Sequence, residues 1–200
     1  AKAKLAFIPD DIFYFRQANL KEMKKYYEGI YPTFDPELFD KLMECFPAVD
    51  HKRNIRRMSK GMQKQAAFLL AISCKPQILV LDEPTAGLNP RAHNDILEMV
   101  ETIHRREKNI IFLVSHNMND IARMSDKVIV MDHGRKMMDG TPSEVFSHEK
   151  ELREMGLALP DSMELVSKLR NAGMEIPGEF LTMEDAADGI AEVLKKKGLR

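Results

Sequence analysis

Two adjacent carboxylates, Asp82 and Glu83, follow directly on the apolar run Ile78–Leu81. An apolar run of this length is typical of a strand that is buried on both faces of a parallel sheet. Pro84 ends such a strand, because it has no N–H to donate to a neighbouring strand. In open α/β sheets, ligands bind outside the carboxyl ends of the strands. We therefore expect the two carboxylates to lie in a ligand site.

The chemistry that suits this acidic pair is phosphate chemistry. Asp82 can hold Mg²⁺ directly or through water, because Mg²⁺ prefers oxygen ligands and keeps some of its waters. Glu83 beside it can polarise the water that attacks a phosphorus atom. The alternative is that the two acids only form a turn before the helix that Pro90 begins. The motifs on either side of the pair favour the phosphate site.

A helix upstream of the acidic pair begins in a way that suits an anion. Ser59 is a favoured N-cap, and the residues after it keep a helical period to about Ser73. The start of a helix offers free N–H groups and a positive dipole end to an anion. Lys60 could add a positive charge near the phosphates, and Gly61 follows it. The alternative is a capped helix without a ligand.

A histidine follows the next apolar run of the chain. The run Ile110–Val114 indicates another buried strand, and His116 stands just beyond its end. An imidazole at this place can donate to a γ-phosphate oxygen and orient the attacking water. A histidine after a strand can also be only the polar start of a helix. The acidic pair on the preceding strand favours the functional role.

These motifs resemble those of ATP-binding-cassette (ABC) ATPases, and they occur in the same order. Leu79–Pro84 resembles the Walker B motif, and Thr85–Pro90 resembles the D-loop after it. Met58–Gln63 resembles the signature motif in the Ser-Lys-Gly-Met form of some exporter-type subunits, and Ser115–His116 resembles the switch histidine. The resemblance implies an α/β fold: a partial RecA-like P-loop NTPase core with an inserted helical subdomain and a C-terminal helical extension.

The resemblance also implies ATP and Mg²⁺ as cofactors, and it suggests a role for each residue of the motifs. Glu83 would activate the attacking water, Asp82 would hold Mg²⁺ and His116 would sense the γ-phosphate. Ser59 and Gly61, at the start of the signature helix, would clamp ATP that a second ATPase subunit holds.

Two positions depart from the family pattern. Asn89 stands where the family usually has Asp, so this D-loop can still hydrogen-bond but lacks the charge that couples the two nucleotide sites. Asp10 follows a predicted strand at residues 4–8 and stands nearest to the family's Q-loop Gln or Glu, which senses Mg²⁺. Its side chain is one methylene shorter than that of Glu. The alternative for Asp10 is a turn acid after a strand.

The resemblance divides the chain into four parts. Residues 1–17 would be a remnant of the ATPase core with the Q-loop region, residues 18–57 the helical subdomain, residues 58–145 the signature helix and the rest of the core, and residues 146–200 a C-terminal helical extension. The front half resembles exporter-type subunits, whereas the tail resembles the ATPases of energy-coupling factor vitamin transporters. The chain is therefore either a natural sequence or a mosaic joined near the switch strand.

The phosphate-binding motif of the family, G-x-x-x-x-G-K-[ST], is absent from the 200 residues, since none of the ten glycines is followed by lysine. We therefore expect the chain to lack the family's N-terminal portion. It would be either a fragment or a chain whose half-sites another chain completes. In both cases we expect it to bind ATP weakly and to be inactive by itself.

Composition limits the partners and the location. A net charge of −1 supplies no overall field for nucleic acid, so we expect no nucleic-acid partner. The basic cluster His51–Arg57 is interpreted as a solvated loop, although it could also touch acidic lipid headgroups or nucleic acid. The longest apolar runs are too short to span a bilayer, and we expect no signal peptide. We expect a peripheral protein on the cytoplasmic face of the cell membrane.

We expect the protein to be an ATP-binding and ATP-hydrolysing subunit of an ABC transporter. It would pair with a second ATPase subunit, identical or different, and would energise transport through a transmembrane permease. The first alternative is a non-transport ABC protein of DNA repair or translation, which the near-neutral charge and the lack of a long coiled coil disfavour. The second alternative is a catalytically silent interaction or regulatory module, which the presence of Glu83 and His116 disfavours.

Overall fold

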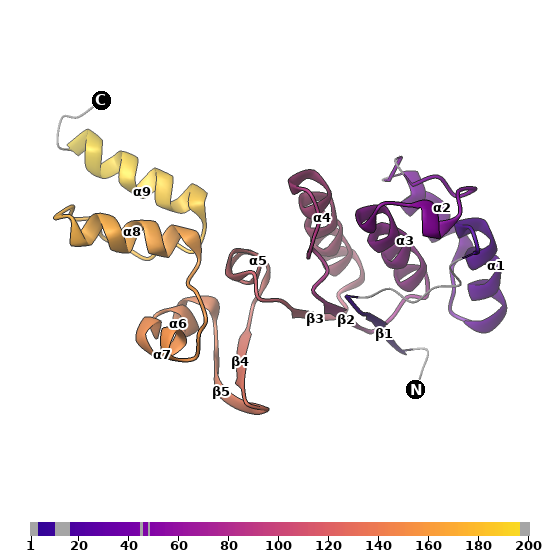
Figure 1. The fold of residues 1–200 in the computed structure, drawn as a ribbon, viewed down its shortest axis with the longest axis horizontal. Coiled ribbons are helices and arrows are strands. Elements are labelled where there is room, and N and C mark those ends of the chain that lie inside the picture. Colours follow the sequence, from indigo (N-terminus) through magenta and orange to yellow (C-terminus); the bar gives the residue numbers. More distant parts are fainter. Residues whose placement is uncertain (1–3, 11–16, 45, 48, 197–200) are drawn as a thin grey trace. The chain divides into compact units, whose positions relative to one another are not determined.

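The protein divides into two compact units (Figure 1). The structure, a computed structural model, describes residues 4–10, 17–44, 46–47 and 49–196. The first unit comprises residues 1–114 and the second unit residues 115–200. Each unit has its own sheet.

The first unit is built on a parallel sheet with the strand order β1-β2-β3. β1 spans Leu5–Ile8, β2 spans Ile78–Asp82 and β3 spans Ile110–Val114. Asp82 on β2 lies beside Val114 on β3. Because the three strands run in the same direction, their carboxyl ends lie at the same edge of the sheet. The predicted α/β class with a parallel sheet is confirmed.

Two long helices cover one face of this sheet (Figure 1). α3 spans Lys60–Ser73 and α4 spans Pro90–Glu107. α3 is buried on nearly every side, whereas α4 buries a single apolar stripe, as an amphipathic helix does. Leu79 and Leu81 on the covered face of β2 are fully buried. A core of the first unit therefore lies between β2 and these helices.

The opposite face of the same sheet is apolar and exposed. Phe7 on β1 is 55% exposed, Phe112 on β3 is 51% exposed, and Val80 between them is partly exposed. The prediction that β2 and β3 are buried on both faces is therefore wrong in this structure. The reason is that successive side chains of a strand point to opposite faces, and α3 and α4 cover only one of them.

A pair of shorter helices links β1 to the start of α3. α1 spans Leu20–Ile30 and α2 spans Pro36–Glu44, and both pack against α3. Asn19 and Glu22 form a capping box, in which each side chain accepts a hydrogen bond from the other residue's backbone N–H. A 3₁₀ helix, η2, spans Ile55–Arg57 and leads directly into α3.

The second unit begins with α5, Met118–Met124, and a β-hairpin. The hairpin consists of β4, Val128–Asp132, and β5, Arg135–Gly140, which pair in antiparallel fashion. His133 and Gly134 between the strands both have positive φ, 45° and 73°. A two-residue turn with positive φ at both positions matches the right-handed twist of the flanking strands.

Four helices follow the hairpin, in two pairs with separate cores. Their bounds are Pro142–Phe146 for α6, Glu149–Glu154 for α7, Asp161–Asn171 for α8 and Met183–Lys196 for α9. The core beside the hairpin contains Ala122, Val128, Val130, Val145, Phe146, Leu152 and Leu159. The core between α8 and α9 contains Val166, Ile176, Ala186 and Val193. The helices α6 and α7 therefore pack with α5 and the hairpin, whereas α8 and α9 pack around a core of their own.

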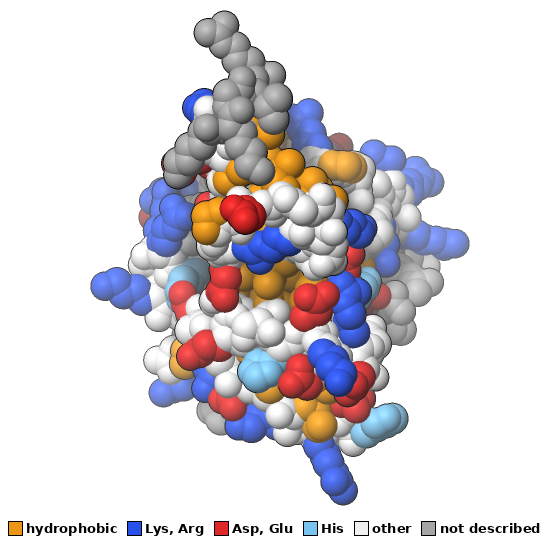
Figure 2. All heavy atoms as spheres, turned by 90° about the vertical axis from the view of Figure 1, so that its left-hand side faces the viewer, with side chains coloured by type: hydrophobic (Ala, Val, Ile, Leu, Met, Phe, Trp, Pro, Cys, Tyr) orange, Lys and Arg blue, Asp and Glu red, His pale blue; other side chains and the backbone are white. Residues whose placement is uncertain are grey.

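The surface carries charges of both signs. Figure 2 shows acidic and basic side chains interspersed over the face that it draws, as the net charge of −1 leads one to expect. Among the helices that the structure describes, none combines the length and the apolar composition needed to cross a membrane.

Candidate functional site

The carboxyl edge of the parallel sheet holds the acidic pair. Asp82 is the last residue of β2, and Glu83 follows it. The backbone N–H of Glu83 donates a hydrogen bond of 2.9 Å to the carbonyl oxygen of Val114, so the residue after β2 stays tied to the end of β3. Both acids therefore stand at the edge where ligands of open α/β sheets bind.

The backbone of Glu83 is in the left-handed conformation, with φ at 45°. This conformation costs an L-residue about 1 kcal/mol or more and persists only where the surroundings hold it. The turn after Glu83 provides part of that support, because the N–H of Ala86 donates to the carbonyl oxygen of Glu83 at 3.2 Å. Pro84 inside the turn is fully buried. Strained residues of this kind are concentrated at functional sites.

The acidic pair suits Mg²⁺, although it is not a complete metal cage. Within the described part of the chain, no three or more His, Cys, Asp or Glu side chains gather as metal ligands. At phosphate sites Mg²⁺ is usually held by one or two carboxylates, while waters and phosphates complete its shell. The carboxylate of Asp82 at the sheet edge therefore fits Mg²⁺ as one of the few protein ligands that such a site needs.

The predicted helix start at Ser59 is confirmed. The hydroxyl of Ser59 accepts a hydrogen bond of 3.3 Å from the N–H of Met62, as an N-cap does. Gly61 lies close to the start of α4: a Cβ at this position would stand 3.4 Å from both the Cβ of Ala92 and a methyl group of Leu88. The signature-like segment is thus packed against the D-loop-like segment of its own chain.

Asn89 is the N-cap of α4. Its side-chain oxygen accepts a hydrogen bond of 3.0 Å from the N–H of Ala92. Sequence reasoning missed this role, although an Asn directly before Pro90 is a strong signal for a helix start. The amide of Asn89 is therefore engaged within its own chain.

Asp10 lies just beyond β1 and faces the start of α3. Its carboxylate is 3.0 Å from the Nζ of Lys64 and 3.7 Å from the Nζ of Lys60. The hydrogen bond from Lys64 is the main cause that lowers the pKa of Asp10 below its ordinary value. The stem of Lys60 also lies over Gly87 in the turn after β2. The structure thus brings Asp10, Lys60 and the D-loop-like turn together.

Lys64 is a residue that sequence reasoning missed. It is only 1% exposed, and lysines are almost never fully buried unless they are paired. The sequence offered one signal: Lys64 comes shortly before the apolar run Ala66–Leu70 and four residues after Lys60, on the same side of the helix. A lysine at a core position predicts acceptors on the neighbouring elements.

His116 belongs to the second unit and lies just before α5. The hydroxyl of Ser115 accepts a hydrogen bond of 3.1 Å from the N–H of Asn117, and Asn117 in turn caps α5. The histidine therefore stands in a hydrogen-bonded helix start. The other predicted site residues all lie in the first unit: Asp10, Ser59, Lys60, Gly61, Asp82, Glu83 and Asn89.

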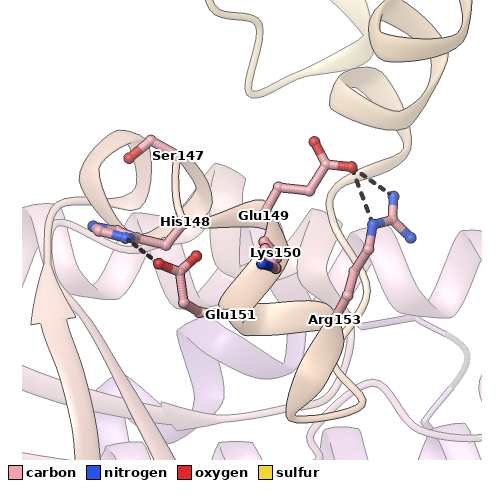
Figure 3. A pocket seen from close by; sticks show the side chains of 6 residues that line it. All are labelled: Ser147, His148, Glu149, Lys150, Glu151 and Arg153. Carbon is pink, nitrogen blue, oxygen red and sulfur yellow. Dashed lines mark hydrogen bonds and ion pairs between the residues drawn. The ribbon is translucent and has the colours of Figure 1, made fainter.

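An open pocket around α7 contains none of the predicted site residues (Figure 3). Arg153 lies 3.0 Å from both Glu149 and Glu164, so it joins α7 to α8. His148 lies 3.5 Å from Glu151 (Figure 3). These side chains of the pocket pair with one another or with α8, and we interpret the cluster as structural.

The chain matches a known protein family and several known proteins. The family model described as "AAA domain, putative AbiEii toxin, Type IV TA system" matches residues 1–120. The energy-coupling factor transporter ATP-binding protein EcfA2 of Caldanaerobacter subterraneus subsp. tengcongensis is 43% identical over 138 residues, which are 69% of this chain and 48% of that protein. The protein of the same name from Clostridioides difficile is 38% identical over 71% of this chain and 50% of its own length. The chain thus spans about half the length of these curated relatives.

The curated matches also bear on the mosaic alternative. A match of 138 residues in a chain of 200 must include residues 63–138. The match therefore includes the strand at residues 110–114. In a mosaic, the exporter-like front part and the tail would be joined near this strand. The same relative is similar to this chain on both sides of that strand.

Two solved structures share the fold. A structure described as the ATP-binding subunit of an ABC transporter has a TM-score of 0.63 and 22% identity, and covers 84% of this chain and 69% of that one. An inward-facing metal-chelate type ABC transporter has a TM-score of 0.61 and 15% identity, and covers 74% of this chain and 62% of that one. At these identities the likeness shows the fold alone. The family model matches more than half of the chain, and the chain therefore belongs to the AAA-domain family that this model describes. The names of the curated relatives and the shared fold agree with the predicted likeness to ABC ATPases.

Proposed function

We propose that this protein is an ATP-binding and ATP-hydrolysing subunit of an ABC transporter. The observation that carries the proposal is the placement of Glu83, which stands in a left-handed backbone directly after Asp82 at the carboxyl edge of the parallel sheet. Asp82 would hold Mg²⁺, which, when bound, neutralises charge on the phosphates. Glu83 would accept the proton of the attacking water. The names of the curated relatives, which are ATP-binding proteins of transporters, support the same assignment.

The start of α3 would bind the γ-phosphate of ATP that a second ATPase subunit presents. The first N–H groups of a helix have no acceptor inside the helix, which leaves those of Lys60 and Gly61 available to an anion. The ammonium group of Lys60 would add a positive charge near the phosphates. On the ATP of its own chain, not on that of the second subunit, His116 would donate a hydrogen bond to the γ-phosphate and orient the water.

A second ATPase subunit and a transmembrane permease would be the partners of this chain. The proposal is supported by the relatives' names, which describe components of energy-coupling factor transporters. The protein would then lie on the cytoplasmic face of the membrane as a peripheral subunit. Recovery of a membrane permease with the natural protein would distinguish this function from that of a non-transport ABC protein.

The direct test is MgATP turnover by the natural protein, purified with the chains that accompany it. Asp82→Asn removes a charged oxygen ligand, so we expect turnover to fall by at least tenfold and the Mg²⁺ requirement to rise. Asp95→Asn is the matched control, because Asp95 is an exposed acid on α4. Equal turnover in the wild-type protein and the Asp82→Asn variant would refute the metal role, and no turnover in the wild-type protein would refute the proposed function.

A further inference from the structure

Lys64 forms a buried junction between three segments of the first unit. Its Nζ donates to the carboxylate of Asp10 at 3.0 Å, to the carbonyl oxygen of Glu83, and to the carbonyl oxygen of Ala86 at 3.3 Å. An ammonium group has three N–H donors, so three acceptors match its capacity. The three acceptors come from the end of β1, the residue after β2 and the turn that follows.

The backbone of Glu83 is held on both sides of its α carbon. On one side, its N–H donates to Val114 at 2.9 Å. On the other side, its carbonyl oxygen accepts hydrogen bonds from Lys64 and from the N–H of Ala86. These bonds orient the two peptide groups and so define the left-handed φ of 45°. The direction of the side chain from the α carbon follows from this backbone conformation.

We propose that Lys64 is a positioning residue for Glu83. The inference deepens the proposed function and rests on it, because positioning matters for turnover only if Glu83 activates the attacking water. Reacting groups must be held to within about 0.5 Å, and a misplacement of about 1 Å can lower a rate roughly 100-fold. Lys64 also lies five residues after Ser59 on a continuous helix. Lys64 therefore ties the backbone of Glu83 to the helix whose start would bind the ATP of the second subunit.

A purely structural role for Lys64 would be to neutralise Asp10. The structural role needs only the bond from Lys64 to Asp10, whereas the positioning role needs the bond from Lys64 to the carbonyl oxygen of Glu83. Asp10→Asn removes the charge of the carboxylate and leaves the bonds from Lys64 to the two carbonyl oxygens. Lys64→Met keeps the unbranched stem of the side chain and removes all three bonds. The double variant Asp10→Asn/Lys64→Met removes both charges of the Asp10–Lys64 pair, and it replaces Lys64→Met if that variant does not fold.

The first measurement is amide hydrogen exchange in the natural protein, which does not depend on ATP. In Lys64→Met we expect the amide of Ala86, which bonds to the carbonyl oxygen of Glu83, to exchange at least tenfold faster. The amide of Lys75 is the internal control, because it bonds to Ile72 at the other end of α3. An unchanged exchange rate at Ala86 would overturn the inference, whatever the protein does with ATP.

The second measurement is the kinetics of MgATP turnover in the same variants. We expect Lys64→Met to lower kcat at least tenfold and to change KM less than threefold, with a smaller loss in Asp10→Asn. Equal losses in the two single variants would overturn the inference, because Lys64 would then act only through Asp10. If the wild-type protein hydrolyses no MgATP, the proposed function fails, and the exchange of the Ala86 amide still decides whether Lys64 holds the Glu83 turn.

Discussion

Asp82 and Val114 are register partners at the carboxyl edge of the parallel sheet. Paired residues on neighbouring parallel strands point to the same face, and alternate residues of one strand do so too. Asp82 therefore shares a face with Val80 and with Val114, which is 52% exposed. The predicted metal ligand belongs to the exposed apolar face of the sheet, not to the face that α3 and α4 cover.

The two faces of the sheet should respond differently to substitution. Leu81 is fully buried, so Leu81→Ala should lower the free energy of unfolding by about 2–5 kcal/mol. Phe112 on the opposite face is half exposed, and Phe112→Thr should lower it by about 1 kcal/mol or less. Urea unfolding measures the free energy of unfolding of the two variants. Equal decreases in the two variants would show that the strand register, or the assignment of residues to the two faces, is wrong.

The cap of α4 gives a second prediction, with Asn89 as the residue to change. Asn89→Ala removes the side-chain acceptor and should lower the free energy of unfolding by about 1 kcal/mol. Asn89→Asp keeps an acceptor and adds a negative charge at the helix start, so it should be neutral or stabilising by up to about 1 kcal/mol. Chemical denaturation compares the two, and a destabilised Asp variant would argue against the capping role.

Gly87 in the turn after β2 has φ at 70°. A Cβ at this position would lie 3.5 Å from the side chain of Lys60, which is ordinary contact. The cost of Gly87→Ala should therefore come from the backbone and amount to roughly 1 kcal/mol. Gly87→Asn should cost less, because Asn tolerates the left-handed conformation better. Thermal and chemical unfolding measure the stability of both variants. If both are as stable as the wild-type protein, this explanation is contradicted.

The sequence predicted the elements that follow local rules. The N-cap at Ser59 and the strands predicted at residues 78–81 and 110–114 depend on residue types within a few positions. The structure confirms the cap and both strands, and β2 includes one residue more, Asp82. The exposure of Phe112 could not be predicted from the apolar run at residues 110–114. An apolar run indicates that its side chains can be buried. The packing of distant segments decides whether another element covers them.

The parts of the site that sequence reasoning missed depend on contacts between distant segments. Lys64 meets Asp10 and Glu83 only because β1, α3 and β2 converge in the fold. The left-handed backbone of Glu83 likewise depends on partners in β3 and α3. The acidic pair together with the motifs on either side of it predicts a phosphate site, whereas the contacts that support Glu83 could be found only in the fold.

The ion pairs of Asp139 make the stability of the hairpin depend on pH. Lys127 at 2.7 Å and Lys136 at 2.9 Å lower the pKa of Asp139 from its ordinary value of 3.8 to about 2. Because the folded-state pKa is below the unfolded one, the ionised carboxylate stabilises the folded protein above about pH 4, and this contribution is lost as the pH falls toward 2.

The matching experiment compares the wild-type protein with Asp139→Asn at several pH values. At pH 6 the wild-type hairpin should be the more stable of the two, by hydrogen exchange of its amides, and the difference should shrink as the pH approaches 2. Lys127→Met should raise the pKa of Asp139 toward its ordinary value, because it removes the larger of the two causes. A difference between wild type and Asp139→Asn that does not change with pH would contradict the ion-pair account.

The most direct test of the catalytic account is the rate of MgATP hydrolysis by the natural protein with Glu83→Gln. The amide keeps the size of the side chain but cannot accept the proton of water, so we predict a loss of kcat of about 100-fold to 10,000-fold, with MgATP binding retained. Glu98→Gln, an exposed acid on α4, should leave the rate unchanged. A Glu83→Gln protein that hydrolyses MgATP at the wild-type rate would contradict the assignment of Glu83 as the general base.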